Sequence, residues 1–279
     1  MATPRSAIVI TLAAALGFAT PLPSSAGFIV REVGGDSTTA SIQATVDLFR
    51  ADLGDPNNGN TPGPLPSGRR EINWDGGGST ATALAGTPFA GFQGIRGALF
   101  TTPGTGFAQV PVGDVDDLFS NPTYGVKFST FSPVRLFTPI GSNIVDVTFF
   151  IPGAPTPATV QGFGAVFTDV DLATGAQLQF FGLSDQLLFS DFVTPGTIPN
   201  GSLSFLGAVG DAGERIARVR ITAGNVAPGP NEVGGPAAID IVLMDDFLYS
   251  EPQAVPEPAA VGLLAIALTA LVFHTRRNT

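Results

Sequence analysis

The sequence predicts a mainly β protein, a jelly-roll-like antiparallel β-sandwich with one short helix near its start. Short apolar runs are separated by Gly, Pro and Asn turns, as in proteins built from many short strands. The chain has 35 Gly and 24 Pro, yet 44% of its 279 residues are hydrophobic, which argues against disorder. The spacing of the runs is that of a sandwich or jelly roll. All-β domains of this length are commonly single units.

The first 26 residues have the three parts of a secretory signal peptide. Arg5 supplies a positive start, residues 7–19 form an apolar stretch, and Ser24 and Ala26 are small residues at the positions that signal peptidase reads. We therefore expect an N-terminal signal helix over residues 1–26 and cleavage after Ala26. The mature body is then expected at residues 27–253.

One helix is expected at about residues 38–53. The apolar side chains that share one helical face are Ile42, Val46, Phe49 and Leu53. Residues 37–39 offer capping hydroxyls, and Gly54 can end the helix. No other helix is expected within the body.

Strands are expected from about residue 70 to residue 250. The run YGVKFSTF (124–131) alternates and predicts a strand. The run NIVDVTFFI (143–151) is almost continuously apolar and predicts a fully buried strand, whereas RIARVRIT (215–222) predicts a half-buried one. We find no internal repeat and no linker that would divide residues 27–253 into two domains.

Charge and residue types exclude several functions. The formal net charge is −10, and all 23 acidic residues lie between residues 27 and 258, which argues against a nucleic-acid partner. The chain has no cysteine, and its one histidine is His274. Thiol catalysis, zinc thiolates and a Ser-His-Asp triad are therefore excluded in residues 27–253. Carboxylate chemistry and oxygen-ligated cations such as calcium remain.

Two acidic pairs are candidates for a calcium site. Asp169 and Asp171 fall on one face at the end of a strand, because side chains at i and i+2 project together. Asp245 and Asp246 lie in the last strand, and we expect only one of them to join such a site. Calcium needs about six to eight oxygens. A solvated turn with local capping bonds is the alternative for the first pair.

Trp74 and Asp75 are candidates for glycan binding. An indole face can stack on a sugar ring, and a neighbouring carboxylate can accept hydroxyl hydrogens. Core packing is the alternative, since tryptophan is highly buried on average. Glu71 and Glu214 are the glutamates considered for a glycosidase, which needs two carboxylates about 5–9.5 Å apart across a cleft. The acidic run VGDVDDLF (112–119) predicts a solvated loop; an Asp-rich calcium loop is the alternative, but the run lacks the glycine and the terminal glutamate of an EF-hand.

The last 26 residues, 254–279, combine three features. Val255, Pro256, Glu257 and Pro258 are followed by an apolar run at 259–273 and by Arg276 and Arg277. As a helix the run would reach roughly 22 Å, which is short for a bilayer core of about 30 Å. The arginines would stay on the cytoplasmic side. A plain membrane anchor is the alternative.

Together with the signal peptide, this tail resembles the PEP-CTERM sorting signal of Gram-negative bacteria. The resemblance implies processing by an exosortase, a membrane-embedded transpeptidase that would recognise Pro256–Pro258, and a setting of extracellular polysaccharide and biofilm. The body also resembles a recurring type of PEP-CTERM passenger. The matching stretches include INWDG (72–76), GERIARVRIT (213–222) and IDIVLMDDFLYSEP (239–252).

The function expected from these observations is that of an exported, non-enzymatic cell-surface or matrix protein that binds glycan or protein. A carboxylate-based glycan hydrolase or lyase and a purely structural surface protein are the alternatives. Expected partners are signal peptidase, exosortase, extracellular polysaccharide or surface proteins, and the membrane through the C-terminal helix before processing. No cofactor is expected beyond a calcium ion.

Overall fold

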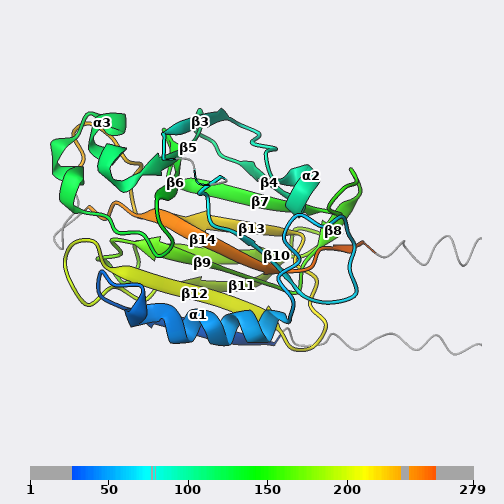
Figure 1. The fold of residues 1–279 in the computed structure, drawn as a ribbon. Helices are drawn as coiled ribbons and strands as arrows, with labels where there is room; N and C mark the ends of the chain where they lie inside the picture. The colour runs from blue at the N-terminus through cyan, green and yellow to red at the C-terminus, as the bar shows by residue number, and fades with distance from the viewer. Residues whose placement is uncertain (1–26, 77, 79, 234–238, 256–279) are drawn as a thin grey trace, which may run out of the picture.

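Two antiparallel β-sheets lie face to face in the computed structural model, which describes residues 27–76, 78, 80–233 and 239–255 (Figure 1). The mainly β architecture predicted from the sequence is confirmed. The expected signal helix, the apolar helix at 259–273 and the sorting motif beyond Val255 lie outside the described residues. Among the described helices, none has the length and apolar character that a membrane span requires.

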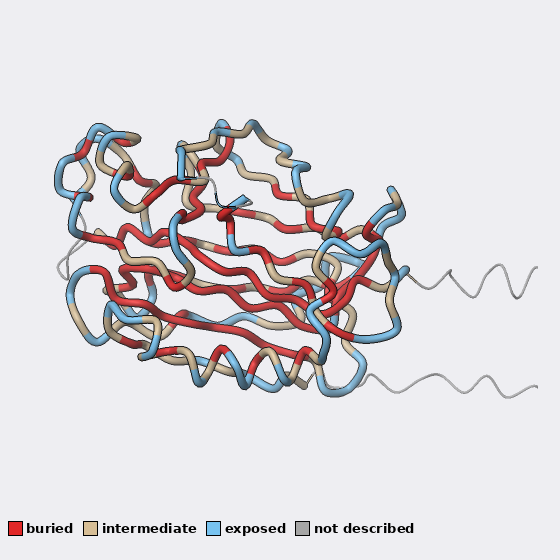
Figure 2. The backbone as a smooth tube through the Cα atoms, viewed as in Figure 1, coloured by how far each residue is buried: buried red, intermediate tan, exposed pale blue. Residues whose placement is uncertain are grey.

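The first sheet has eight strands in the order β1-β12-β9-β14-β6-β5-β3, with β2 paired to β14. Its strands are β1 (Phe28–Gly34), β2 (Arg69–Ile72), β3 (Ala83–Gly86), β5 (Gly106–Pro111), β6 (Arg135–Ile140), β9 (Gly162–Thr168), β12 (Leu203–Gly210) and β14 (Leu243–Ser250). The middle strands β9 and β14 are buried along their whole length, as Figure 2 shows. Both faces of the middle of this sheet are therefore covered.

The second sheet has seven strands in the order β11-β10-β13-β7-β8-β15, with β4 paired to β7. Its strands are β4 (Ala98–Thr101), β7 (Ile144–Phe150), β8 (Pro157–Thr159), β10 (Gln177–Phe181), β11 (Leu187–Phe192), β13 (Arg218–Thr222) and β15 (Gln253–Ala254). The half-buried β13 is confirmed. The expectation that β7 is fully buried is wrong, because only alternate residues face the core, and Asp146 pairs outside it with Arg218 and Arg220.

The main core fills the space between the sheets and is rich in phenylalanine. Trp74 lies within it, fully buried and stacked on Phe137 with ring centroids 3.7 Å apart. Phe100 and Phe247 meet the same indole edge-on. Phe137 and Phe247 belong to the first sheet and Phe100 to the second, so this aromatic cluster joins the two sheets. Its burial stabilises the fold by about 25 cal/mol for each Å² of apolar area removed from water.

The helix α1 (Ala40–Leu53) covers the outer face of the first sheet, next to β12 (Figure 1). Its buried residues are the four predicted ones, and Gly54 ends it. The ring of Phe49 fits against β9 and β12 because Gly164 and Gly207 leave room there. A Cβ at either position would come 2.7 Å from that ring.

Three short helical segments cover one end of the first sheet over a third apolar cluster: η1 (Val112–Asp114), α3 (Val115–Phe119) and η2 (Pro122–Val126). The predicted loop at 112–119 is therefore helical. The strand predicted at 124–131 is also wrong. Pro122 starts a turn whose first free amide is capped by the Asn121 side chain, which accepts from Thr123 N at 3.1 Å. The strand β1 and the short helix α2 (Gln93–Arg96) were not expected.

Candidate functional site

A polar pocket of about 300 Å³ lies among α1, β2, α2 and β14. Its lining residues are Arg50, Asn57, Glu71, Asn73, Arg96, Ser132 and Asp246. Every one of these side chains can donate or accept a hydrogen bond. Small-molecule sites usually have volumes of about 300 Å³ or more, so the pocket can admit one small polar group.

An irregularity in β14 brings two consecutive carboxyls to this place. The register with β9 shifts between Met244 and Phe247, so Asp245 and Asp246 lie in a bulge. The Ser132 hydroxyl reaches both, at 2.6 Å from Asp246 Oδ1 and 3.3 Å from Asp245 Oδ1. Because the bulge breaks the alternation of the strand, both carboxyls reach Ser132, although only Asp246 lines the pocket.

Asp245 and Asp75 organise the loop at residues 131–135. Asp245 Oδ2 accepts from Phe131 N at 2.7 Å, and Asp75 Oδ1 accepts from Val134 N at 2.6 Å. Burial raises the pKa of Asp245 well above its ordinary value, and the neighbouring Asp246 carboxyl adds to the rise. The buried pair therefore favours a shared proton over two negative charges. These groups build the wall that carries Ser132 into the pocket.

Asp246 and Glu71 face the same guanidinium. Arg50 Nη2 lies 3.1 Å from Glu71 Oε2 and 3.7 Å from Asp246 Oδ2. Burial raises the pKa of Asp246 to about 6, although the hydrogen bond from Ser132 and the Arg50 charge oppose the rise. Glu71 also accepts from Arg69 Nε at 2.6 Å. The two carboxylates are thus held in fixed positions before any ligand arrives.

Arg96 is the second guanidinium of the pocket. Its Nε donates to Asn60 Oδ1 at 2.9 Å, and among the described residues it has no carboxylate partner within ion-pair distance. Burial lowers its pKa from the ordinary value. The Tyr249 hydroxyl donates to the Arg96 carbonyl at 3.0 Å and ties α2 to β14. Arg96 can therefore offer donors to an anionic group in the pocket.

Trp74 and Asp75 lie beside this pocket but inside the fold. Trp74 is fully buried, and its Nε1 donates to the Asp245 carbonyl at 3.0 Å. A sugar ring has no exposed face of this indole on which to stack, so the core-packing alternative describes its position. Trp74 also has φ +64°, a left-handed conformation that is unusual for a bulky residue.

Asp169 and Asp171 lie in a different acidic cluster, with Asp240 and Lys127. Asp240 accepts from Asp171 N at 3.1 Å, and Lys127 Nζ lies 3.9 Å from Asp169 Oδ2. The Oδ2 atoms of Asp169 and Asp171 are buried and accept no hydrogen bond from the described residues. Burial raises the pKa of Asp169 to about 7 and that of Asp240 to about 6, and neighbouring acids add to both.

The four predicted calcium ligands therefore fall in two clusters. Within the described part of the chain, no group of three or more His, Cys, Asp or Glu side chains is arranged to hold a metal ion. Glu214 lines a pocket apart from Glu71, at the end of β12. Arg50, Asn73, Arg96 and Asp240 were missed, because isolated polar residues in a sequence carry no sign of where they converge.

No protein-family model matches the chain, and comparisons with curated proteins and with solved structures found no significant match.

Proposed function

We propose that this chain is an exported, exosortase-sorted surface or matrix protein whose β-sandwich binds extracellular glycan without cleaving it. The single observation that carries the binding proposal is the preformed polar pocket at Arg50, Glu71, Asn73, Arg96 and Asp246. Sugar hydroxyls both donate and accept hydrogen bonds. A site for them needs carboxylates, amides and guanidiniums side by side, as in this pocket.

The pocket favours a sugar that carries an acidic group. Glu71 and Asp246 both face Arg50, and Glu71 is also paired with Arg69, whereas Arg96 has no carboxylate partner in the described structure. A carboxylate on the ligand can take that place, since guanidinium–carboxylate hydrogen bonds are short and about twice as strong as neutral ones. The acidic body would repel such a polymer elsewhere, so recognition must be local.

Binding without cleavage follows from the position of Arg50. A glycosidase needs open space between two carboxylates for the glycosidic bond and, in inverting enzymes, a water molecule. Here one guanidinium nitrogen contacts both Glu71 and Asp246. A hydrolase is the second candidate, because the raised pKa of Asp246, about 6, suits a general acid. Release of reducing ends from the bound polysaccharide, lost in Asp246→Asn, would favour it.

Export and sorting are proposed from the two termini of the sequence. The described fold supports a cleavable tail that starts directly after the body. Ala254 pairs with Ala158 at the edge of the second sheet, and the Arg215 side chain donates to the Ala254 carbonyl at 3.0 Å. Exosortase would therefore act on a motif that begins one residue beyond the sheet, with the membrane helix as its transient anchor.

Two finer features belong to the same proposal. The sandwich is of jelly-roll type, and a calcium ion binds at Asp169 and Asp171, whose Oδ2 atoms accept no hydrogen bond within the described structure. Lys127 competes for this place, because its ammonium already lies 3.9 Å from Asp169. Asp245 and Asp246 are left out of the calcium proposal, since both bind the Ser132 loop.

The test compares binding of the host's extracellular polysaccharide by the processed protein, with and without a change in the pocket. Asn73 is exposed and has no hydrogen bond within the described structure, so Asn73→Ala should fold normally. We expect saturable binding by the wild type and several-fold weaker binding by this variant. Asn231→Ala, at an exposed site outside the pocket, is the matched control. Absence of binding by the wild type would contradict the proposal and favour a purely structural coat protein.

A further inference from the structure

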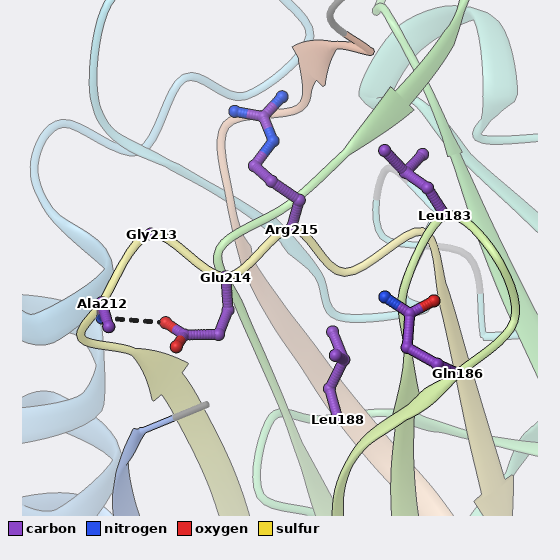
Figure 3. A pocket seen from close by; sticks show the side chains of 7 residues that line it. All are labelled: Leu183, Gln186, Leu188, Ala212, Gly213, Glu214 and Arg215. Atoms are coloured by element: carbon purple, nitrogen blue, oxygen red, sulfur yellow. Dashed lines mark hydrogen bonds between the residues drawn. The ribbon is translucent and has the colours of Figure 1, made fainter. Parts of the chain in front are cut away.

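Gly27, the residue that signal-peptide cleavage would make the first of the mature protein, lies against two acidic side chains. Its backbone nitrogen donates to Glu214 Oε1 at 3.0 Å, and its carbonyl accepts from Asp211 N at 3.2 Å. Glu214 Oε2 accepts from Ala212 N at 2.8 Å, the bond drawn in Figure 3. The Glu214 carboxylate thus joins the start of the body to the turn after β12.

The register of β1 and β12 sets this geometry. Phe28 pairs with Gly210, so Gly27 extends one residue beyond the last pair and faces the turn that begins at Asp211. A Cβ at Gly27 would lie 2.2 Å from Asp211 Oδ1, so the carboxylate packs directly on the glycine Cα. Only glycine fits here without moving Asp211. The Gly27 nitrogen thus faces the Glu214 carboxylate, and the exposed Asp211 carboxylate lies beside the Gly27 Cα.

We propose that Asp211 and Glu214 form a receptor for the mature N-terminus, which binds the α-ammonium of Gly27 once the signal peptide is removed. This proposal rests on the proposed export and is independent of glycan binding. Hydrolysis of the Ala26–Gly27 bond consumes one water molecule. The water oxygen goes to the carbonyl carbon of Ala26, and the Gly27 nitrogen takes up protons to become an ammonium.

Cleavage changes the interaction in kind. Before it, Gly27 offers one neutral N–H to Glu214. After it, the same atom carries a positive charge and three donors beside two carboxylates, which strengthens the hydrogen bonds. Slight burial works to raise the pKa of Glu214, yet hydrogen bonds from backbone N–H groups, that of Gly27 among them, lower it overall. The carboxylate is therefore ionised and ready for a cation at neutral pH.

The other charged group of this turn does not compete for Glu214. Arg215 lines the same pocket (Figure 3). Its Nη2, however, donates to the carbonyls of Gln253 and Ala254. The remaining lining residues are Leu183, Gln186, Leu188, Ala212 and Gly213, none of which is charged. The ends of the body thus lie on either side of one turn: Gly27 against Glu214, and Ala254 against Arg215.

The test uses the full chain, expressed with its own signal peptide in a Gram-negative host and purified after export. Mass spectrometry should find Gly27 at the N-terminus. Competitive acylation over a pH series then gives the pKa of the α-amine. The only other amine is Lys127, which is 6% exposed and separable by peptide mapping. We expect this pKa above the ordinary value of about 8, because two carboxylates favour the charged form.

Glu214→Gln should move the labelling profile towards lower pH, whereas Glu32→Gln, an equal charge change on exposed β1, should not. Asp211→Asn is the second variant if the first is not exported. A wild-type profile equal to that of Glu214→Gln would overturn the receptor and leave export standing. A mature chain that starts elsewhere, or a chain that is not cleaved, would overturn both.

Discussion

Replacing Asp169 by Asn should change how the stability of the fold depends on pH. Asp169 is fully buried, its Oδ1 accepts from Gly201 N at 3.0 Å, and Lys127 Nζ lies 3.9 Å from its Oδ2. Asparagine keeps the shape of the side chain and the Oδ1 acceptor but removes the titrating proton. The substitution therefore isolates the electrostatic part of the role of Asp169.

The sign and size follow from the pKa of Asp169, which burial raises to about 7 from an ordinary 3.8. Between these values the folded state keeps a proton that the unfolded state has lost. The free energy of unfolding therefore falls as the pH rises from about 4 to about 7 and levels off above that. At 1.36 kcal/mol for each pH unit the loss is about 4 kcal/mol. Asp240, with a pKa of about 6, adds a loss of the same sign.

Urea unfolding at a series of pH values measures this loss, with the fluorescence of Trp74, the only tryptophan and a fully buried one, as the probe. We expect the wild type to lose stability between pH 4.5 and 7.5, and Asp169→Asn to lose about 2 to 4 kcal/mol less. Asp191→Asn, at an exposed site, should follow the wild type. Equal pH profiles for wild type and Asp169→Asn would refute the reasoning.

Three further predictions follow from other contacts. Glu251→Gln should lower the free energy of unfolding, measured in urea, by about 3 to 5 kcal/mol. The substitution breaks the buried bidentate pair with Arg70, whose two hydrogen bonds are 2.6 and 2.7 Å long. A loss below about 1 kcal/mol would contradict this. Trp74→Phe should cost about 1 to 3 kcal/mol by the same assay, followed by circular dichroism, since it removes the bond to the Asp245 carbonyl and leaves a cavity. The calcium proposal requires that millimolar calcium raises the Tm of the wild type at pH 8 and leaves that of Asp169→Asn unchanged; no rise would contradict it.

The sequence predicted the elements whose period is strong and uninterrupted. The helix at 38–53 could be read because Ile42, Val46, Phe49 and Leu53 share one face, and all four are buried in α1. The strand β13 could be read from simple alternation. The run at 124–131 failed because Pro122 begins a helical turn that overrides the alternation. The strand β1 was missed, since its residues are mostly partly exposed and carry no clean period.

The candidate site was predicted only in pieces. Trp74 and Asp75 were singled out for glycan, and Asp245 and Asp246 for calcium, but nothing in the sequence shows that these two stretches meet around Ser132. A bulge in β14 brings them together, and a bulge is set by strand pairing far along the chain. The position of a guanidinium in a pocket likewise depends on tertiary packing rather than on sequence period.

The most direct test of the account is the affinity of the processed protein for the host's polysaccharide, measured by calorimetry with wild type and Arg96→Gln. Arg220→Gln, on the other sheet, is the matched control. The account predicts saturable binding by the wild type and an affinity about tenfold or more lower for Arg96→Gln, since hydrogen bonds to a charged group contribute about 1.5 to 3 kcal/mol. It predicts a similar loss of affinity for the wild type when the carboxyl groups of the polysaccharide are reduced. Equal affinities for wild type and Arg96→Gln, or no binding at all, would contradict it.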